Sequence, residues 1–229
     1  TTLFRSRPGG YYGYGGPKVS ADRPLGYDPQ LCWIPHSVDN SSGSQVWIPE
    51  GVWGPFGGQM LHLLWGRSTM MLVLRDTVAG VRQGAVVPLP AKFQTGPDRA
   101  SFSPRDGSLL VCGSTGWQTN ARKDGAVHRV RYTGRPVALP IGWHAESGAL
   151  VVRFTQALDR ATAEDPGSYG IKQWNYRYAS DYGSKDWSVA DPTKEGRDNV
   201  EVKSVRLLPD GKSVRLEIPG LRPVMQMEV

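Results

Sequence analysis

Short apolar runs, each followed by turn residues, make up most of the chain beyond residue 31. The runs are about four to eight residues long, and Gly, Pro, Asp or Ser separates one run from the next. Runs of this length with such boundaries are typical of β-strands. In the first half, strands are predicted at residues 45–48, 58–65, 69–74, 85–89, 108–112 and 126–132.

The second half also contains short apolar runs, and in addition one predicted helical turn. A strand is predicted at 149–154, where apolar and polar residues alternate. Residues 159–164 can form a single helical turn before Pro166, because proline disfavours helical geometry in the residue that precedes it. Residues 168–178 are rich in aromatic side chains and predict an extended segment.

Two Asp-Gly pairs predict β-hairpins. The pair at 106–107 comes directly before the strand 108–112, and the pair at 210–211 separates the apolar runs 200–208 and 213–218. Asp-Gly suits a tight turn because glycine takes up positive φ without steric cost. Each pair therefore predicts two antiparallel strands joined by a short turn.

Composition and spacing together predict an all-β fold. Glycine (28) and proline (18) interrupt almost every stretch, which excludes long helices, while eight Trp, nine Tyr and five Phe oppose disorder. Four-stranded units that recur at about forty residues are typical of β-propeller blades, and 45–135 holds roughly two of them. Prolines in 135–140 predict a domain boundary, and strands with turns about every ten residues beyond it predict a β-sandwich.

The predicted organisation has three parts. Residues 1–30 form an irregular Gly/Tyr/Pro-rich segment, of which 1–6 is interpreted as an artificial scar. Residues 31–138 form about two to three propeller blades, and 139–229 form an immunoglobulin-like sandwich whose last strand is cut off. Because a propeller needs about four to eight blades, we expect the chain to be a fragment.

The charge pattern bears on the partners of the protein. A net charge of +6 comes from 27 basic and 21 acidic residues, and Lys and Arg are spread along the chain. Nucleic-acid-binding proteins concentrate positive charge on one face or helix, so no nucleic-acid partner is expected. No apolar run approaches the ~20 residues of a membrane helix, so no membrane span is predicted.

Several kinds of chemistry are excluded by missing motifs. Cys32 and Cys112 are far apart, which leaves their pairing open, and neither belongs to C-x-x-C or to the haem attachment motif C-x-x-C-H. The chain also lacks G-x-G-x-x-G, a phosphate-binding loop and a serine nucleophile elbow. Nicotinamide, ATP and serine-hydrolase chemistry are therefore not expected.

Of the four histidines, His36 is the candidate general base. It lies in a predicted loop near Asp39 and Asn40, and an imidazole beside a carboxylate can accept a proton. The alternative is that Asp39 and Asn40 only stabilise a turn through side-chain hydrogen bonds. His62 and His128 fall inside strand patterns, where a structural role is expected. None of the four forms a zinc-peptidase motif.

Residues 113–124 form a second candidate site. Trp117 offers an aromatic face beside the amide of Gln118 and the cations of Arg122 and Lys123. This combination suits a sugar or an anionic quinone, because rings stack on Trp and carboxylates pair with Arg. It would equally suit a well-packed loop, and the two alternatives stay open.

Six stretches of the first half together carry a resemblance to a known family. They are Leu31-Cys32-Trp33-Ile34-Pro35-His36, Val38-Asp39-Asn40-Ser41-Ser42-Gly43, Gly54-Pro55-Phe56-Gly57-Gly58-Gln59, Asp106-Gly107-Ser108-Leu109, Gly116-Trp117-Gln118-Thr119, and Asp124-Gly125 with 129–134. Together they resemble the C-terminal part of large secreted bacterial proteins whose propeller is related to glucose/sorbosone dehydrogenases. In the second half, Phe154 and the stretches 159–162, 165–169, 174–178 and 182–184 resemble the immunoglobulin-like module that follows such propellers.

The resemblance implies cofactors and a cellular setting. In such propellers the quinone PQQ binds over the central channel with calcium, and a histidine acts as base during hydride transfer from a sugar. A periplasmic or secreted protein is implied, with a carbohydrate or small-molecule substrate and with a cytochrome c module elsewhere in the same protein. The catalytic base is expected in a blade outside this chain.

Two functions are therefore weighed. The leading hypothesis is a fragment of a sugar or aldehyde dehydrogenase-like protein that passes electrons to a quinone or cytochrome c. The competing hypothesis is a non-catalytic extracellular module that binds carbohydrate or a protein, since fold alone does not decide function. For either function, the candidate cofactor- or substrate-binding residues are Asp39, Asn40, Gln59, Trp117, Gln118, Arg122 and Lys123.

Overall fold

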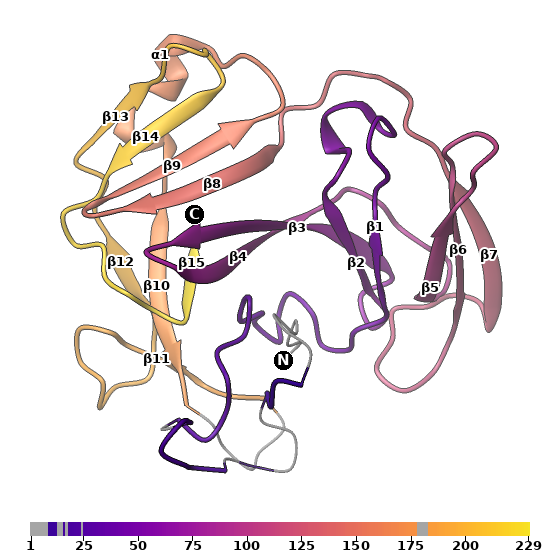
Figure 1. Cartoon of the computed structure of the whole chain (residues 1–229), viewed down its shortest axis with the longest axis horizontal. Helices are drawn as coiled ribbons and strands as arrows, with labels where there is room; N and C mark the ends of the chain where they lie inside the picture. Colours follow the sequence, from indigo (N-terminus) through magenta and orange to yellow (C-terminus); the bar gives the residue numbers. More distant parts are fainter. Residues whose placement is uncertain (1–8, 13–15, 17, 24, 178–182) are drawn as a thin grey trace.

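The computed structural model describes residues 9–12, 16, 18–23, 25–177 and 183–229. In this part of the chain the regular structure is several antiparallel sheets, none of them closed, with little helix (Figure 1). The predicted all-β class is confirmed. The scar predicted at 1–6, together with Tyr178 and Tyr182 of the stretches that resemble the immunoglobulin-like module, lies outside the described residues.

The first sheet is an antiparallel meander in the order β1-β2-β3-β4 (Figure 1). Its strands are β1 (Gln45–Trp47), β2 (Met60–Leu64), β3 (Thr69–Val78) and β4 (Val81–Pro88). Consecutive strands pair directly, with Leu61 opposite Leu72 and Val73 opposite Val86. The four runs predicted in this region are strands, and β3 and β4 are longer than predicted.

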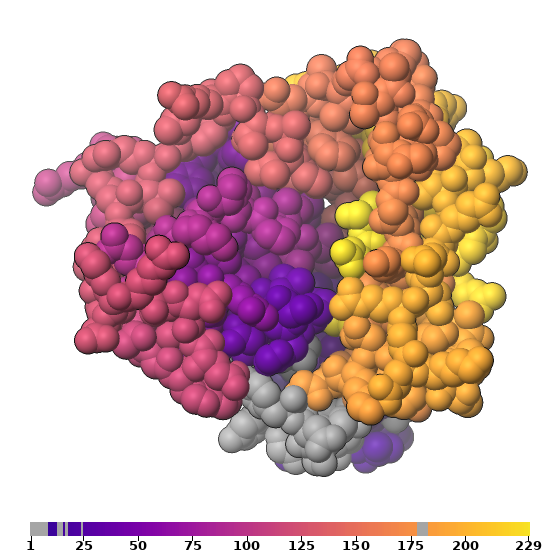
Figure 2. Space-filling model, turned by 180° about the vertical axis from the view of Figure 1, so that it is seen from behind, coloured from indigo at the N-terminus to yellow at the C-terminus, as the bar shows by residue number. Residues whose placement is uncertain are grey.

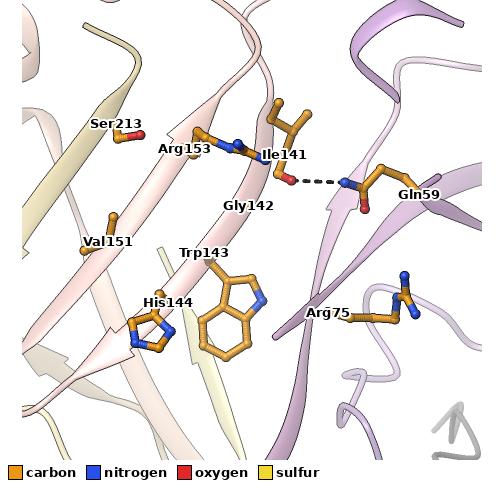
Figure 3. A pocket seen from close by; sticks show the side chains of 9 residues that line it. All are labelled: Gln59, Arg75, Ile141, Gly142, Trp143, His144, Val151, Arg153 and Ser213. Carbon is orange, nitrogen blue, oxygen red and sulfur yellow. Dashed lines mark hydrogen bonds between the residues drawn. The ribbon is translucent and has the colours of Figure 1, made fainter. Parts of the chain in front are cut away.

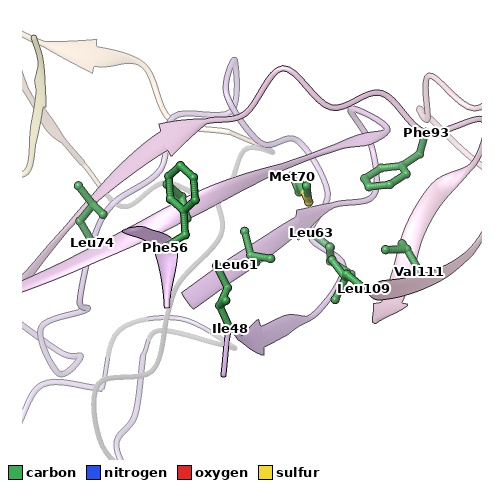
Figure 4. Close-up of a cluster of buried hydrophobic side chains, with 10 residues drawn as sticks. Ile48, Phe56, Leu61, Leu63, Met70, Leu74, Phe93, Leu109 and Val111 are labelled. Atoms are coloured by element: carbon green, nitrogen blue, oxygen red, sulfur yellow. The ribbon is translucent and has the colours of Figure 1, made fainter. Parts of the chain in front are cut away.

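β2 and the first half of β3 are buried on both faces of this sheet. One face packs into a core formed by Ile48, Phe56, Leu61, Leu63, Met70, Leu72, Leu74, Phe93, Leu109 and Val111 (Figure 4). On the other face Met60, Leu64, Met71 and Val73 pack against Leu31, Cys32 and Ile34. Because neither face meets water, these strands are apolar in the sequence apart from His62 and Thr69. The 3-10 turn η1 (Gly54–Phe56) carries Phe56 into the first core.

The second sheet has the order β5-β6-β7 and shares the first core. Its strands are β5 (Gly96–Phe102), β6 (Leu109–Ser114) and β7 (Gly125–Val130). Leu109 and Val111 of β6 are fully buried, whereas Leu110 between them is 42% exposed. This alternation is typical of a sheet with one face on a core and the other in water.

The second half of the chain forms two further sheets with a core between them. One sheet has the order β13-β14-β9-β8, and in the other β10 pairs with β11, β12 and β15. Leu150, Ile171, Leu216 and Ile218 are buried between the two sheets. The strands are β8 (Pro140–Glu146), β9 (Ala149–Phe154), β10 (Ile171–Tyr176), β11 (Asp186–Trp187), β12 (Asp198–Val200), β13 (Ser204–Leu207), β14 (Ser213–Glu217) and β15 (Gln226–Glu228).

The predicted helical turn is present as α1 (Arg160–Ala163), followed by the 3-10 turn η2 (Pro166–Ser168). Asp159 caps α1, because its carboxylate accepts a hydrogen bond from the Thr162 backbone N–H at 2.9 Å. Hydrogen bonds from the backbone and side chain of Thr162 lower the pKa of Asp159. The helical turn predicted at residues 159–164 is therefore confirmed as α1.

Both predicted hairpins form, although their turns are wider than a tight Asp-Gly turn. Phe102 pairs with Leu109 across the loop 103–108, and Leu207 pairs with Val214 across the loop 208–213. In each loop the glycine of the Asp-Gly pair has positive φ, +65° in the first and +64° in the second. The Asp side chain accepts hydrogen bonds from the backbone just beyond it, which closes the wider loop.

The two halves of the molecule lie side by side, as Figure 2 shows from behind. β3 lies against β8, and Trp143 of β8 packs on the first core as well as on the core of the second half. Trp33 stacks on Tyr176 of β10, with ring centroids 4.8 Å apart. β8 begins at the end of the proline-bracketed connector and was not predicted, since prolines at 136 and 140 indicate extended linker.

The alternation in β6 allows a matched test of core packing. Leu109→Ala should lower the free energy of unfolding by about 2–5 kcal/mol, because it leaves a cavity in a close-packed core. Leu110→Ala, the same change on the neighbouring exposed position, should cost less than about 1 kcal/mol. Chemical denaturation of both variants measures the difference, and equal losses would contradict the strand register.

Candidate functional site

The carboxylate of Asp39 meets His62. Asp39 Oδ2 lies 2.8 Å from His62 Nε2, and both side chains have no exposed surface. On the other side of the ring, His62 Nδ1 lies 2.9 Å from the Gln45 side-chain amide. The register of β1 and β2 places Gln45 opposite His62, so the strand pairing itself builds this contact. A ring sealed in this way cannot reach a substrate, and its role is structural.

Residues 39–42 form a turn that the Asp39 side chain stabilises, which is the structural role weighed for Asp39 in the sequence. Asp39 Oδ1 accepts a hydrogen bond from Ser41 N at 3.1 Å, and Asp39 Oδ2 accepts one from Ser42 Oγ at 2.8 Å. The backbone carbonyl of His36 accepts a hydrogen bond from Arg67 at 3.2 Å. The proposed role of His36 as a base stays a prediction, while Asp39 has a clear structural role.

The loop 113–124 is held against Trp65. The Trp65 indole donates to Ser114 Oγ at 3.2 Å, and Thr119 Oγ1 donates to the Trp65 carbonyl at 3.1 Å. A side chain at position 116 would lie 3.0 Å from the Trp65 ring, so glycine permits this close approach. Asn120 N donates to the Gly66 carbonyl at 2.9 Å. These contacts fix the loop from both of its ends.

The structure brings the two predicted clusters together. Asn40 Nδ2 donates to the backbone carbonyl of Gln118 at 3.0 Å, across 78 positions of sequence. Trp117, the neighbour of Gln118 in the same turn, is 71% exposed. Arg122 and Lys123 are also exposed, and the backbone N–H groups of both donate to the Gln94 carbonyl. We call residues 113–124 the Trp117 loop; it carries Trp117, Gln118, Arg122 and Lys123, and Asn40 contacts it from outside.

Gln59, also predicted as a binding residue, lies outside the Trp117 loop. It lines a cleft of about 330 Å³ between the first sheet and the β13-β14-β9-β8 sheet (Figure 3). Its amide donates to the Ile141 carbonyl of β8 at 3.3 Å. Arg75, His144 and Arg153 line the same cleft and were not identified from the sequence, because they come from separate strands and form no local motif.

The described residues contain no group of three or more His, Cys, Asp or Glu side chains that could hold a metal ion. They also contain no helix with the length and hydrophobicity of a membrane span. Cys32 and Cys112 are both free, the first buried and the second exposed. Burial raises the pKa of the Cys32 thiol to about 12.

Comparison of the chain with protein-family models, curated proteins and solved structures found no match. The resemblance to propellers of the glucose/sorbosone dehydrogenase type therefore stays a prediction from the sequence. The function has to be argued from the two surfaces that the structure builds, the Trp117 loop and the cleft.

The buried pair gives the second test. Asp39→Ala should lower the free energy of unfolding by about 3 kcal/mol or more, because it leaves the buried His62 ring without its carboxylate partner. Asp124→Ala, an exposed aspartate in the Trp117 loop, should change it by less than about 0.5 kcal/mol. Urea denaturation compares them, and a small effect of Asp39→Ala would show that the pair is not needed for folding.

The cysteines give the third test. At about pH 8 a thiol reagent should modify Cys112 quickly, while Cys32 should react only after unfolding, because a raised pKa keeps its thiol protonated and burial blocks access. We therefore expect one fast thiol per native chain and two in denaturant. Cys112→Ser should abolish the fast reaction. Two fast thiols would contradict the burial of Cys32, and none in either state would indicate a disulfide.

Proposed function

We propose that this chain is a non-catalytic carbohydrate-binding module of a periplasmic or secreted protein, with the Trp117 loop as its binding surface. The observation that carries this proposal is a tryptophan with 71% of its surface exposed at the tip of a loop that is otherwise firmly anchored. Tryptophan is enriched at recognition surfaces, because it combines a large apolar ring with a polar N–H.

The anchoring of the loop supports binding on energetic grounds. A ligand that meets a mobile loop loses affinity to the ordering of that loop, whereas a fixed loop avoids this loss. The Trp65, Gly66 and Asn40 contacts already order residues around Trp117. A sugar ring can stack on the indole, while the exposed side chains of Arg122 and Lys123 can donate to hydroxyl or acidic groups.

The fold class proposed from the sequence fits this function. The β1-β2-β3-β4 meander has the strand order of a propeller blade, and β5-β6-β7 is a three-stranded neighbour on the same core. The two sheets of the second half, with a core between them, have the layered arrangement of an immunoglobulin-like sandwich. We propose these identities for residues 31–138 and 139–229.

A sugar or aldehyde dehydrogenase-like function is the second proposal, and the blade-like meander is the observation in its favour. It would require a base that a substrate can reach and the PQQ and calcium that the resemblance implies. His62 is sealed from solvent, and the described residues offer no calcium site. We therefore derive no catalytic step for this chain.

The fourth test addresses the Trp117 loop. Trp117→Ala should weaken retention on insoluble polysaccharide by roughly thirtyfold, the effect of removing an anchor worth about 2 kcal/mol. Trp47→Ala removes another exposed tryptophan, on β1, and should leave retention unchanged. Co-sedimentation with a panel of insoluble glycans measures both. If the intact protein binds none of them, or if Trp117→Ala binds as well as the parent, the proposal fails.

A further inference from the structure

The cleft that contains Gln59 shares no residue with the Trp117 loop and has a different chemistry. Its volume of about 330 Å³ is at the lower end of the range for small-molecule sites. One wall comes from β3 and from the residue before β2, and the opposite wall comes from β8, β9 and β14 (Figure 3). The two walls belong to different halves of the chain, and such junctions are common ligand sites.

Two arginines give the cleft a positive charge. Arg75 of β3 and Arg153 of β9 line it from opposite walls, and no Asp or Glu is among the lining residues. Within the described chain neither guanidinium has an ion-pair partner at salt-bridge distance. The pKa of Asp210 is lowered chiefly by hydrogen bonds from Ser213 and Lys212, with a further contribution from the charge of Arg153. Two guanidinium groups without a close counter-ion favour an anionic ligand.

Both guanidinium groups are held in position by neighbours that do not neutralise them. Arg75 lies over the Trp47 ring, 4.3 Å from its centroid, which restricts the side chain while leaving its charge in place. Arg153 lies along the backbone of β8, where a Cβ at Gly142 would be only 3.3 Å from its Nε. Glycine at 142 therefore leaves room for the guanidinium, and a larger residue would displace it.

The cleft also contains an unsatisfied hydrogen-bond donor. The indole N–H of Trp143 is buried and has no acceptor among the described residues. An unpaired buried donor costs about 1–3 kcal/mol, so a nearby acceptor on a ligand would be favoured. Gln59 donates to Ile141 and keeps its amide oxygen available to accept from a ligand hydroxyl. The cleft thus offers polar groups for a hydroxylated molecule beside its two cations.

A contact between the walls fixes their spacing. His144 Nδ1 of β8 lies 2.6 Å from Asp76 Oδ2 of β3. A carboxylate can only accept, so this ring nitrogen carries the proton and the other nitrogen, Nε2, is left for a further hydrogen bond. The His144 side chain is 49% exposed and lines the cleft, which makes it accessible to a ligand.

We infer that this cleft binds a small sugar acid, with the carboxylate held by Arg153 and the hydroxyl groups held by Gln59, Trp143 and His144, while Arg75 adds positive charge from the opposite wall. Guanidinium groups match carboxylate oxygens in geometry and charge. The Trp143 ring and Ile141 supply an apolar wall for the face of a sugar ring. Neither the charge nor the shape of the cleft depends on the Trp117 loop.

Isothermal titration calorimetry on the full chain tests this inference with D-glucuronate, D-glucose and inorganic phosphate as probes. Glucuronate should bind at least about tenfold more tightly than glucose, because the two differ by the carboxylate. It should also bind more tightly than phosphate, which lacks the ring. No glucuronate binding up to about 10 mM, equal binding of glucose, or tighter binding of phosphate would each overturn the inference.

Matched variants locate the binding. Arg153→Gln should weaken glucuronate binding by about tenfold or more and Arg75→Gln by a smaller factor, while Arg206→Gln, on β13 of the second-half sheet, should not change it. Far-UV circular dichroism confirms that each variant is folded. Trp117→Ala should leave glucuronate binding intact, which separates this site from the proposed glycan surface. Unchanged binding in both arginine variants would overturn the assignment.

Discussion

Burial of β2 and β3 on both faces is the constraint on which the rest of the structure depends. One face of these strands closes the core shared with β6, and the other face must be covered by the segment containing Leu31 and Ile34. Close packing on two sides leaves no route for water to satisfy a polar group. Every polar side chain in these strands therefore needs a partner within the protein.

His62 is the buried polar side chain in the middle of β2 that needs such partners. It stands in the middle of β2 with no exposed surface, between Leu61 and Leu63. Asp39 and Gln45 satisfy the two nitrogens of its ring. The pairing with Asp39 fixes the turn at 39–42, and that turn presents Asn40 to the carbonyl of Gln118. One of the contacts that position the Trp117 loop can thus be traced back to this buried histidine.

The cleft has a different origin, since it lies where two sheets from different halves meet. Along β3 the residues are buried as far as Leu74, and Arg75 is the first to emerge from the core. β8 and β9 supply the other wall because β8 is the edge strand of the second-half sheet and adjoins β3, and β9 pairs with β8 next to that edge. Cations that face water on each separate sheet become a shared, partly enclosed site when the sheets adjoin. The proposed ligand sites therefore lie at the margins of the cores, where polar groups remain accessible.

The sequence by itself determined the all-β class, most strands, both hairpins and the helical turn α1. These features follow from patterns over a few neighbouring residues, such as apolar runs, Asp-Gly pairs and the cap at Asp159. β5 and β8 escaped prediction because one is polar and the other begins at a proline, so that pairing with β6 and β9 is what makes them strands.

Only the tertiary structure decided which side chains meet. Sequence proximity suggested His36 as the partner of Asp39, but the packing of the turn at 39–42 on β2 brings His62 there from 23 positions away. Asn40 reaches Gln118 across 78 positions, and Asp76 reaches His144 across 68. Such contacts depend on how whole sheets pair and pack, and no local pattern encodes that geometry. The residue types of a site can be found in the sequence, whereas their arrangement arises from the packing of the sheets.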